Sequence, residues 1–135
     1  MNNCSKILVP ILAIIFMATA CMPHRHATQV RYGENMILDR GDDDEYEIQV
    51  FDSGFDRWFA IHAKPVSFYS PQYYEMMNRR YVIAWNEKVS THAFRRNSPF
   101  EAPINYDPTI DYGLEVNYTL FYYFKYIEDT YGRFM

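Results

Sequence analysis

The sequence is poor in cysteine. It has two cysteines in 135 residues, Cys4 and Cys21. Removal of an amino-terminal leader would take Cys4 away, so no disulfide is expected within the remaining chain. We therefore expect packing, not covalent cross-links, to hold the fold together.

Basic residues are also scarce. The chain has 13 Lys and Arg against 17 Asp and Glu, for a formal net charge of −4. Broad binding to nucleic acids or anionic lipids is driven by clustered Lys and Arg that neutralise phosphates. We therefore expect no nucleic-acid partner.

Long apolar runs are missing too. Residues 7–19 are apolar except for Pro10 and Thr19, and as a helix they would cover about 20 Å of a hydrocarbon core about 30 Å thick. A weakly positive start with Lys6, this short run, and small residues directly before Cys21 are typical of a secretory signal. We predict a signal peptide over residues 1–20.

Small residues that end at a cysteine resemble the lipobox of bacterial lipoproteins, although Ala18 stands where leucine is commonest. The resemblance implies that Cys21 becomes the first residue of the mature chain and carries acyl chains that hold it on a membrane. An ordinary signal peptide with an incidental cysteine, or an uncleaved anchor, are the alternatives.

We predict that residues 21–44 form a lipidated flexible tether. They contain Pro23, Gly33, Gly41 and an acidic run, and they lack sustained periodicity, although residues 35–38 could order against the domain. Residues 45–135 predict one small globular domain rich in aromatic side chains, because the whole chain has 13 Tyr, 10 Phe and 2 Trp.

The first expected element of that domain is a half-buried strand over residues 46–51, where apolar and polar residues alternate. A single strand leaves backbone groups unpaired, so it needs a partner from residues 28–38, from the region around Pro103, or from another chain. A short helix is expected to begin at Asp56 and to end before Lys64 and Pro65.

A long central helix is expected to begin at Ser70-Pro71, with a capping hydroxyl before a proline, and to run to about Phe94. Its buried stripe should comprise Tyr74, Met77, Tyr81, Ala84, Trp85 and Val89, and Asn78 should lie mostly outward. Residues 114–131 fit both strand and helix periodicity, but their length favours a helix that Asp111 could cap. The predicted fold class is α+β, mostly helical.

Several segments resemble a family of short, uncharacterised lipoproteins of Bacteroidota. They are residues 52–58, 68–75, 78–82, 85–86 and 104–118, and the resemblance covers roughly residues 45–126. It carries no known activity. It implies a Gram-negative envelope, where we expect the protein on the outer membrane facing the periplasm.

The most suggestive polar residues lie in the loop of residues 105–112. Asp107 and Asp111 flank Tyr106 and Tyr112, and paired carboxylates beside aromatic rings could perform acid–base chemistry on a sugar or bind a glycan. The simpler interpretation is that Asp107 caps the turn at Pro108 and Asp111 caps the final helix.

Other candidate sites are weaker. His24 and His26 are too few ligands for a metal site, and Ser90 with His92 lacks the surroundings of a hydrolase nucleophile. The acidic run of residues 42–45 lacks the ligand spacing of a calcium loop. We therefore predict no metal, no cofactor and no catalytic residue.

Two hypotheses for function follow. The first is a non-catalytic envelope module that binds protein partners through Tyr, Trp and Arg, residue types enriched at interface hot spots, with Arg79, Arg80 and Trp85 among the candidates. The alternative is a small binder or hydrolase of glycan or peptidoglycan that uses the loop of residues 105–112.

Overall fold

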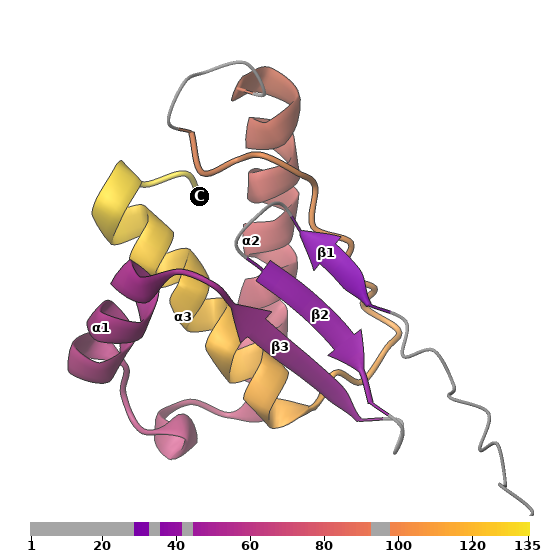
Figure 1. Ribbon diagram of the computed structural model, residues 1–135. Helices are drawn as coiled ribbons and strands as arrows, with labels where there is room; N and C mark the ends of the chain where they lie inside the picture. Colours follow the sequence, from indigo (N-terminus) through magenta and orange to yellow (C-terminus); the bar gives the residue numbers. More distant parts are fainter. Residues whose placement is uncertain (1–28, 33–35, 42–44, 93–97) are drawn as a thin grey trace, which may run out of the picture.

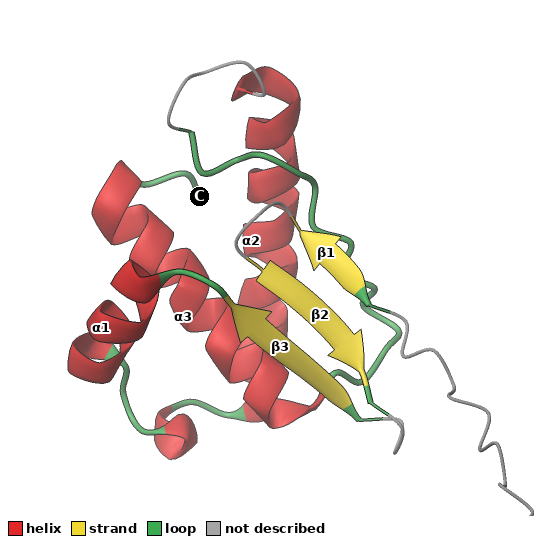
Figure 2. Cartoon of the chain, in the orientation of Figure 1, coloured by secondary structure: helices red, strands yellow, loops and turns green. Residues whose placement is uncertain are grey.

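A computed structural model describes residues 29–32, 36–41, 45–92 and 98–135. Within these residues, three strands are followed by a short helix, a 3-10 turn and two long helices (Figure 1). The elements are β1 (Val30–Tyr32), β2 (Met36–Arg40), β3 (Tyr46–Val50), α1 (Ser53–His62), η1 (Val66–Phe68), α2 (Pro71–His92) and α3 (Gly113–Tyr131). The expected class, a small α+β domain that is mostly helical, is confirmed (Figure 2).

The strands form one antiparallel sheet in the order β1-β2-β3. Ile48 of β3 lies opposite Leu38 of β2, so the partner strand overlaps the first of the three expected sources, residues 28–38, and extends two residues beyond it. The predicted start of the domain at residue 45 is wrong, because β1 and β2 lie in the segment assigned to the tether. Met36 and Leu38 explain the difference, since they are 2% and 9% exposed and bury one face of β2.

Helix α1 begins at Ser53, earlier than the predicted start at Asp56. Asp52 is the cap, and its Oδ1 accepts the N–H groups of Gly54 and Phe55. A Cβ atom at Gly54 would lie 2.6 Å from the hydroxyl of Tyr126, so this glycine permits α1 to approach α3 closely.

Helix α2 begins at Pro71 as predicted, with the Tyr73 N–H donating to Ser70 Oγ. Its described part ends at His92, and residues 93–97 lie outside the described structure. Tyr74, Tyr81 and Trp85 are buried as expected, and the other three members of the predicted stripe are partly buried. The prediction for Asn78 is wrong: it is 0% exposed and faces α3, where it bonds to Asn117.

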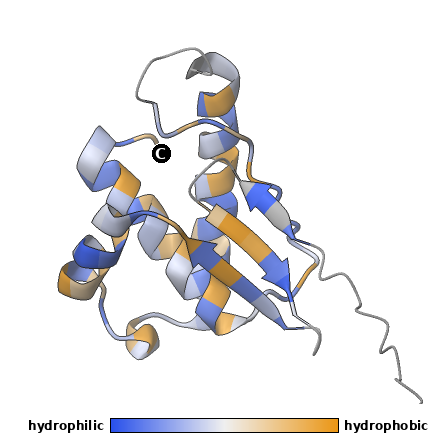
Figure 3. Cartoon of the chain, in the orientation of Figure 1, coloured by the Kyte–Doolittle hydropathy of each residue, from blue (hydrophilic) through white to orange (hydrophobic). Residues whose placement is uncertain are grey.

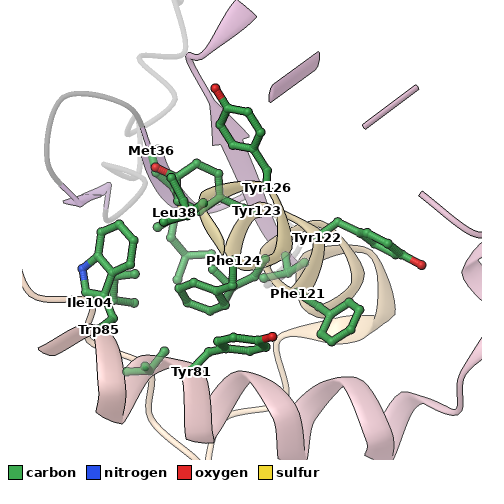
Figure 4. Close-up of a cluster of buried hydrophobic side chains, with 14 of the residues drawn as sticks. Met36, Leu38, Tyr81, Trp85, Ile104, Phe121, Tyr122, Tyr123, Phe124 and Tyr126 are labelled. Atoms are coloured by element: carbon green, nitrogen blue, oxygen red, sulfur yellow. The ribbon is translucent and has the colours of Figure 1, made fainter. Parts of the chain in front are cut away.

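Helix α3 is the centre of the fold, and its expected helical form is confirmed. It contacts α1, α2 and β3. Buried side chains lie on almost all its sides, which is why the sequence also matched strand alternation. Figure 4 shows the aromatic core around it, in which Phe124 lies against Tyr81 and Trp85. None of the described helices is long and apolar enough to cross a membrane.

Candidate functional site

A pocket of about 360 Å³ lies at the end of the sheet where β3 begins. Glu45 and Tyr46 line it from β3 and the residue before it. The other lining residues come from the start of α3 and the two residues before it: Asp111, Tyr112, Gly113, Leu114 and Glu115. The pocket therefore joins two segments that are more than sixty residues apart in the sequence.

Tyrosine rings form the rigid wall of this pocket. The ring of Tyr112 packs edge-on against Tyr46 at 4.9 Å between centroids and stacks on Tyr106 at 4.8 Å. The Tyr112 hydroxyl accepts the N–H of Asp107 at 2.9 Å, and burial raises the pKa of this hydroxyl. Because Tyr112 is only 5% exposed, it supports the wall more than it offers a free surface.

The first turn of α3 approaches the pocket through Gly113. This residue has φ of +79°, a region that L side chains rarely adopt, and a Cβ there would meet no atom within 4 Å. The sequence places glycine here for its backbone angle and not for lack of space.

Three carboxyl groups border the pocket. Asp111 Oδ1 accepts the Gly113 N–H at 2.9 Å, close to its expected role at the start of α3. The side chains of Glu45 and Glu115 are exposed and make no hydrogen bond or ion pair with any described residue. The side chain of Arg40 lies near the pocket, with its guanidinium carbon 5.7 Å from the centre of the Tyr46 ring.

Asp107 does not join Asp111 in the pocket. Its Oδ1 accepts the N–H and the hydroxyl of Thr109, and these hydrogen bonds hold the pKa of Asp107 below its usual value. The simpler interpretation of this residue, a cap for the turn at Pro108, matches these contacts. The two aspartates thus hold separate turns, and the structure gives no support to a catalytic pair.

Tyr106 lies behind the pocket. Its hydroxyl donates to Asn117 Oδ1 at 2.7 Å, and burial raises its pKa to about 12. Tyr106 and Tyr112 therefore form a stacked support below the loop instead of two open platforms for a sugar.

The candidates on α2 lie apart from the pocket. Arg79 is exposed and donates from its guanidinium to the carbonyl of Pro108 at 3.0 Å, so it ties the loop to α2. Arg80 is exposed beside it. Trp85 cannot contact a partner in this fold, because it is 3% exposed and its indole N–H donates to the Ala102 carbonyl.

Buried asparagines are functional supports that the sequence did not reveal. Asn78 Nδ2 donates to the carbonyl and to Oδ1 of Asn117, while Asn117 Nδ2 donates to the carbonyl of Gly113. These bonds fix the first turn of α3, which forms part of the pocket. The available signal was position: Asn78 falls between Tyr74 and Tyr81 at helical spacing.

Asn86 has a similar role in the loop before α3. Its side chain donates to the Ile104 carbonyl and accepts the Ile104 N–H, so it pairs with both backbone groups of one residue. Glu45 and Glu115 were also missed as pocket residues, and no local pattern distinguished them from other surface acids.

The remaining candidates give no second site. Cys21, His24, His26 and residues 42–44 lie outside the described structure. Ser90 Oγ donates to the carbonyls of Asn86 and Glu87 on its own helix. Among the described residues, no group of three or more His, Cys, Asp or Glu side chains could hold a metal ion.

Comparison with known proteins gives one match. Residues 9–135 match the model of a family described as "Family of unknown function (DUF6146)". The chain belongs to this family. No curated protein and no solved structure matches it.

Proposed function

We propose that this member of the DUF6146 family is a lipid-anchored, non-catalytic module of the bacterial envelope that binds a basic segment of a protein partner. The observation that carries the proposal is the pocket at the end of the sheet, where the carboxylates of Glu45 and Glu115 are exposed and have no partner among the described residues. Anionic groups beside a tyrosine ring suit the cationic head of Lys or Arg.

The chain's own Arg40 already lies at the ring of Tyr46, with its guanidinium carbon 5.7 Å from the ring centre. A partner's cation would therefore be held mainly by the carboxylates of Glu45 and Glu115, and less by this ring.

The use of the loop's polar groups argues against acid–base chemistry by the loop of residues 105–112. Asp107 is occupied by Thr109, Tyr106 by Asn117, and the Tyr112 hydroxyl by a backbone N–H. An acid–base catalyst needs a titrating group within reach of its substrate, and these groups are engaged in the fold.

The lipid anchor is part of the proposal. The family match begins at residue 9 and includes Cys21 and the small residues before it. A bacterial lipoprotein on the outer membrane, facing the periplasm, is the setting in which acyl chains on Cys21 would hold the pocket near partner proteins.

Binding of charged peptides to the detergent-solubilised full-length protein tests the pocket. The probes are fluorescent octapeptides of equal length that contain four Lys and Arg, four Glu, or only neutral residues. We expect anisotropy to detect binding of the basic peptide alone, weakened by added salt because the contact is electrostatic. The double change of Glu45→Gln and Glu115→Gln should weaken binding by roughly tenfold or more.

The matched control removes the same charge elsewhere. Glu47 and Glu87 are exposed, on β3 and α2, and do not line the pocket. The double change of Glu47→Gln and Glu87→Gln should leave affinity for the basic peptide unchanged. Equal weakening by both pairs would mean general attraction to an acidic protein, and the proposed pocket function would be abandoned.

A glycan ligand is the second candidate, and the same pocket favours it, because Tyr46 and carboxylates are typical of sugar sites. Chitotriose and a disaccharide muropeptide are the probes. Binding of either that is lost on Tyr46→Ala, with no binding of the basic peptide, would establish the glycan and overturn the protein partner.

A further inference from the structure

The outer edge of β3 is unpaired. The sheet has the order β1-β2-β3, so β3 has β2 on one side, and no described strand pairs with its other side. The Gly41 N–H donates to the Glu45 carbonyl at 2.8 Å, so the carbonyl of Glu45 points toward β2. The direction of the backbone groups alternates along a strand. Those of Tyr46, Ile48 and Val50 therefore point away from β2, and they make no hydrogen bond with any described residue.

The two edges of the sheet differ in how open they are to another strand. β1 is three residues long and has Arg31 at its centre, and short edge strands with charged residues resist pairing with another chain. β3 is five residues long, has no Lys, Pro or Gly, and turns only Tyr46, Ile48 and Val50 toward the core. Figure 3 shows its mixed polar and apolar residues beside the apolar start of β2. The edge of β3 is therefore the one suited to a further strand.

The two faces of β3 predict the pattern that an added strand should have. Ile48 lines one small cavity with Val116 and Leu120 of α3, so the helix covers the inner face of the sheet. Glu47 and Gln49, which alternate with the inward residues, are exposed on the outer face. Residues that lie opposite each other on neighbouring strands share a face. A segment beside β3 should therefore alternate apolar and polar side chains.

The pocket lies where this edge begins. Glu45 is the residue before β3 and Tyr46 is its first residue, and both line the pocket. With a volume of about 360 Å³, the pocket can hold the end of a basic segment but not its whole length. The other residues of a bound segment must leave the pocket, and the unpaired backbone groups of β3 start at Tyr46.

A second copy of this chain is a poorer occupant of the edge than a basic segment of another protein. Residues 45–51 contain no Lys or Arg and include two acids, so a second β3 strand would bring no cation to the pocket. Each chain also has a formal net charge of −4, which opposes association of two copies. A segment with a Lys or Arg complements the carboxylates of Glu45 and Glu115.

From these observations we infer that the basic segment of the partner binds in extended form as a fourth strand antiparallel to β3, with a Lys or Arg near its carboxyl end in the pocket. The inference deepens the proposed function and rests on it. In strand addition, main-chain hydrogen bonds supply affinity and side-chain pockets supply specificity. Antiparallel pairing is the slightly more stable form. It brings the carboxyl end of the segment to Glu45, because β3 runs away from the pocket.

Backbone-methylated peptides test the added strand without altering the protein. The probe is a fluorescent, amidated peptide in which Thr and Val alternate over six residues and two Lys follow at the carboxyl end. Because Thr suits the polar face and Val the apolar face, the Val N–H groups point toward β3 and the Thr N–H groups point away. One version carries methyl groups on the backbone nitrogens of two Val residues. The matched control carries them on two Thr residues.

Anisotropy with the detergent-solubilised full-length protein measures the affinity of each peptide. We expect methylation at Val to weaken binding by about tenfold or more, because hydrogen bonds to β3 are lost. Methylation at Thr should change the affinity by less than about twofold, because those N–H groups face solvent. Glu45→Gln with Glu115→Gln should weaken the unmethylated peptide as it weakens the octapeptide with four cations.

The failure of this inference can be told from the failure of the proposed function. The same affinity for both methylated peptides, with binding still weakened in the double Gln variant, overturns the added strand and leaves the basic ligand of the pocket standing. Binding of the octapeptide with four cations, but not of the alternating peptide, has the same meaning. Failure of every basic peptide to bind overturns the proposed function and this inference together.

Discussion

Two polar regions of this protein meet at the start of α3 and behave in opposite ways. Below the first turn, Asn78, Asn117 and Tyr106 form a buried network in which Asn117 is 2% exposed and has three partner groups. Above it, Glu45 and Glu115 line an open pocket, and their carboxylates make no hydrogen bond or ion pair with any described residue. The first region is organised to hold the helix, and the second has capacity left for a ligand.

The contrast shows that residue type does not identify a site in this fold. Tyrosine and aspartate in the loop of residues 105–112 suggested chemistry, yet Asp107 and Tyr106 bond within the fold. Asparagine on an expected outer face suggested a solvated residue, yet Asn78 is fully buried. The burial of a side chain and its hydrogen-bond partners distinguish residues that support the fold from residues that could bind a ligand. The following substitutions test that distinction.

Loss of the buried network should have the largest effect on stability. Asn117→Ala removes the acceptor of the Tyr106 hydroxyl and the donor to the Gly113 carbonyl. Leaving such buried groups without partners should lower the free energy of unfolding by roughly 2–4 kcal/mol, measured by urea denaturation. Gln72→Ala, at an exposed position of α2, should change it by less than about 0.5 kcal/mol. Equal effects of both changes would contradict the distinction between the two regions.

The sequence predicted the helices of this fold better than the buried polar side chains that support them. Ser70-Pro71 predicted the start of α2, and the length of the last segment indicated α3, because both signals are local. The domain start at residue 45 was wrong because β2 is recognised by its burial against the helices and not by its own pattern. The pocket could not be predicted, since Glu45 and Glu115 meet only after the sheet and α3 have packed.

Alkaline pH should weaken the buried region by a smaller amount. Burial raises the pKa of Tyr106 to about 12, so the folded state favours the neutral hydroxyl more than the unfolded state does. The contribution of the neutral Tyr106 hydroxyl to the free energy of unfolding is complete below about pH 10. It is lost as pH rises toward 12, at no more than about 1.4 kcal/mol per pH unit. The free energy of unfolding of Tyr106→Phe should therefore fall less steeply over this range than that of the native protein.

The control for this titration is Gln72→Ala at an exposed position of α2, which removes no titratable group and should leave the pH dependence as it is in the native protein. Other buried tyrosines, among them Tyr112 and Tyr122, also have raised pKa values, so the slope of Tyr106→Phe should be reduced and not abolished. An unchanged slope would mean that the Tyr106 hydroxyl is not held neutral by the fold.

The pocket acids should have the smallest effect on stability. Glu115 lies in the first turn of α3, where a negative charge stabilises a helix by about 0.3–1 kcal/mol, but it shares the pocket with Glu45 and Asp111, whose like charges oppose it. These contributions offset each other, so Glu45→Gln with Glu115→Gln should alter the free energy of unfolding by less than about 0.5 kcal/mol.

Glu128→Gln is the contrasting change, because the Glu128 side chain is 7% exposed and accepts hydrogen bonds from Lys125 and Tyr81. This substitution should lower the free energy of unfolding by about 1 kcal/mol. A larger loss from the pocket pair than from Glu128→Gln would make those carboxylates part of the fold's support and leave the pocket without free charge for a ligand.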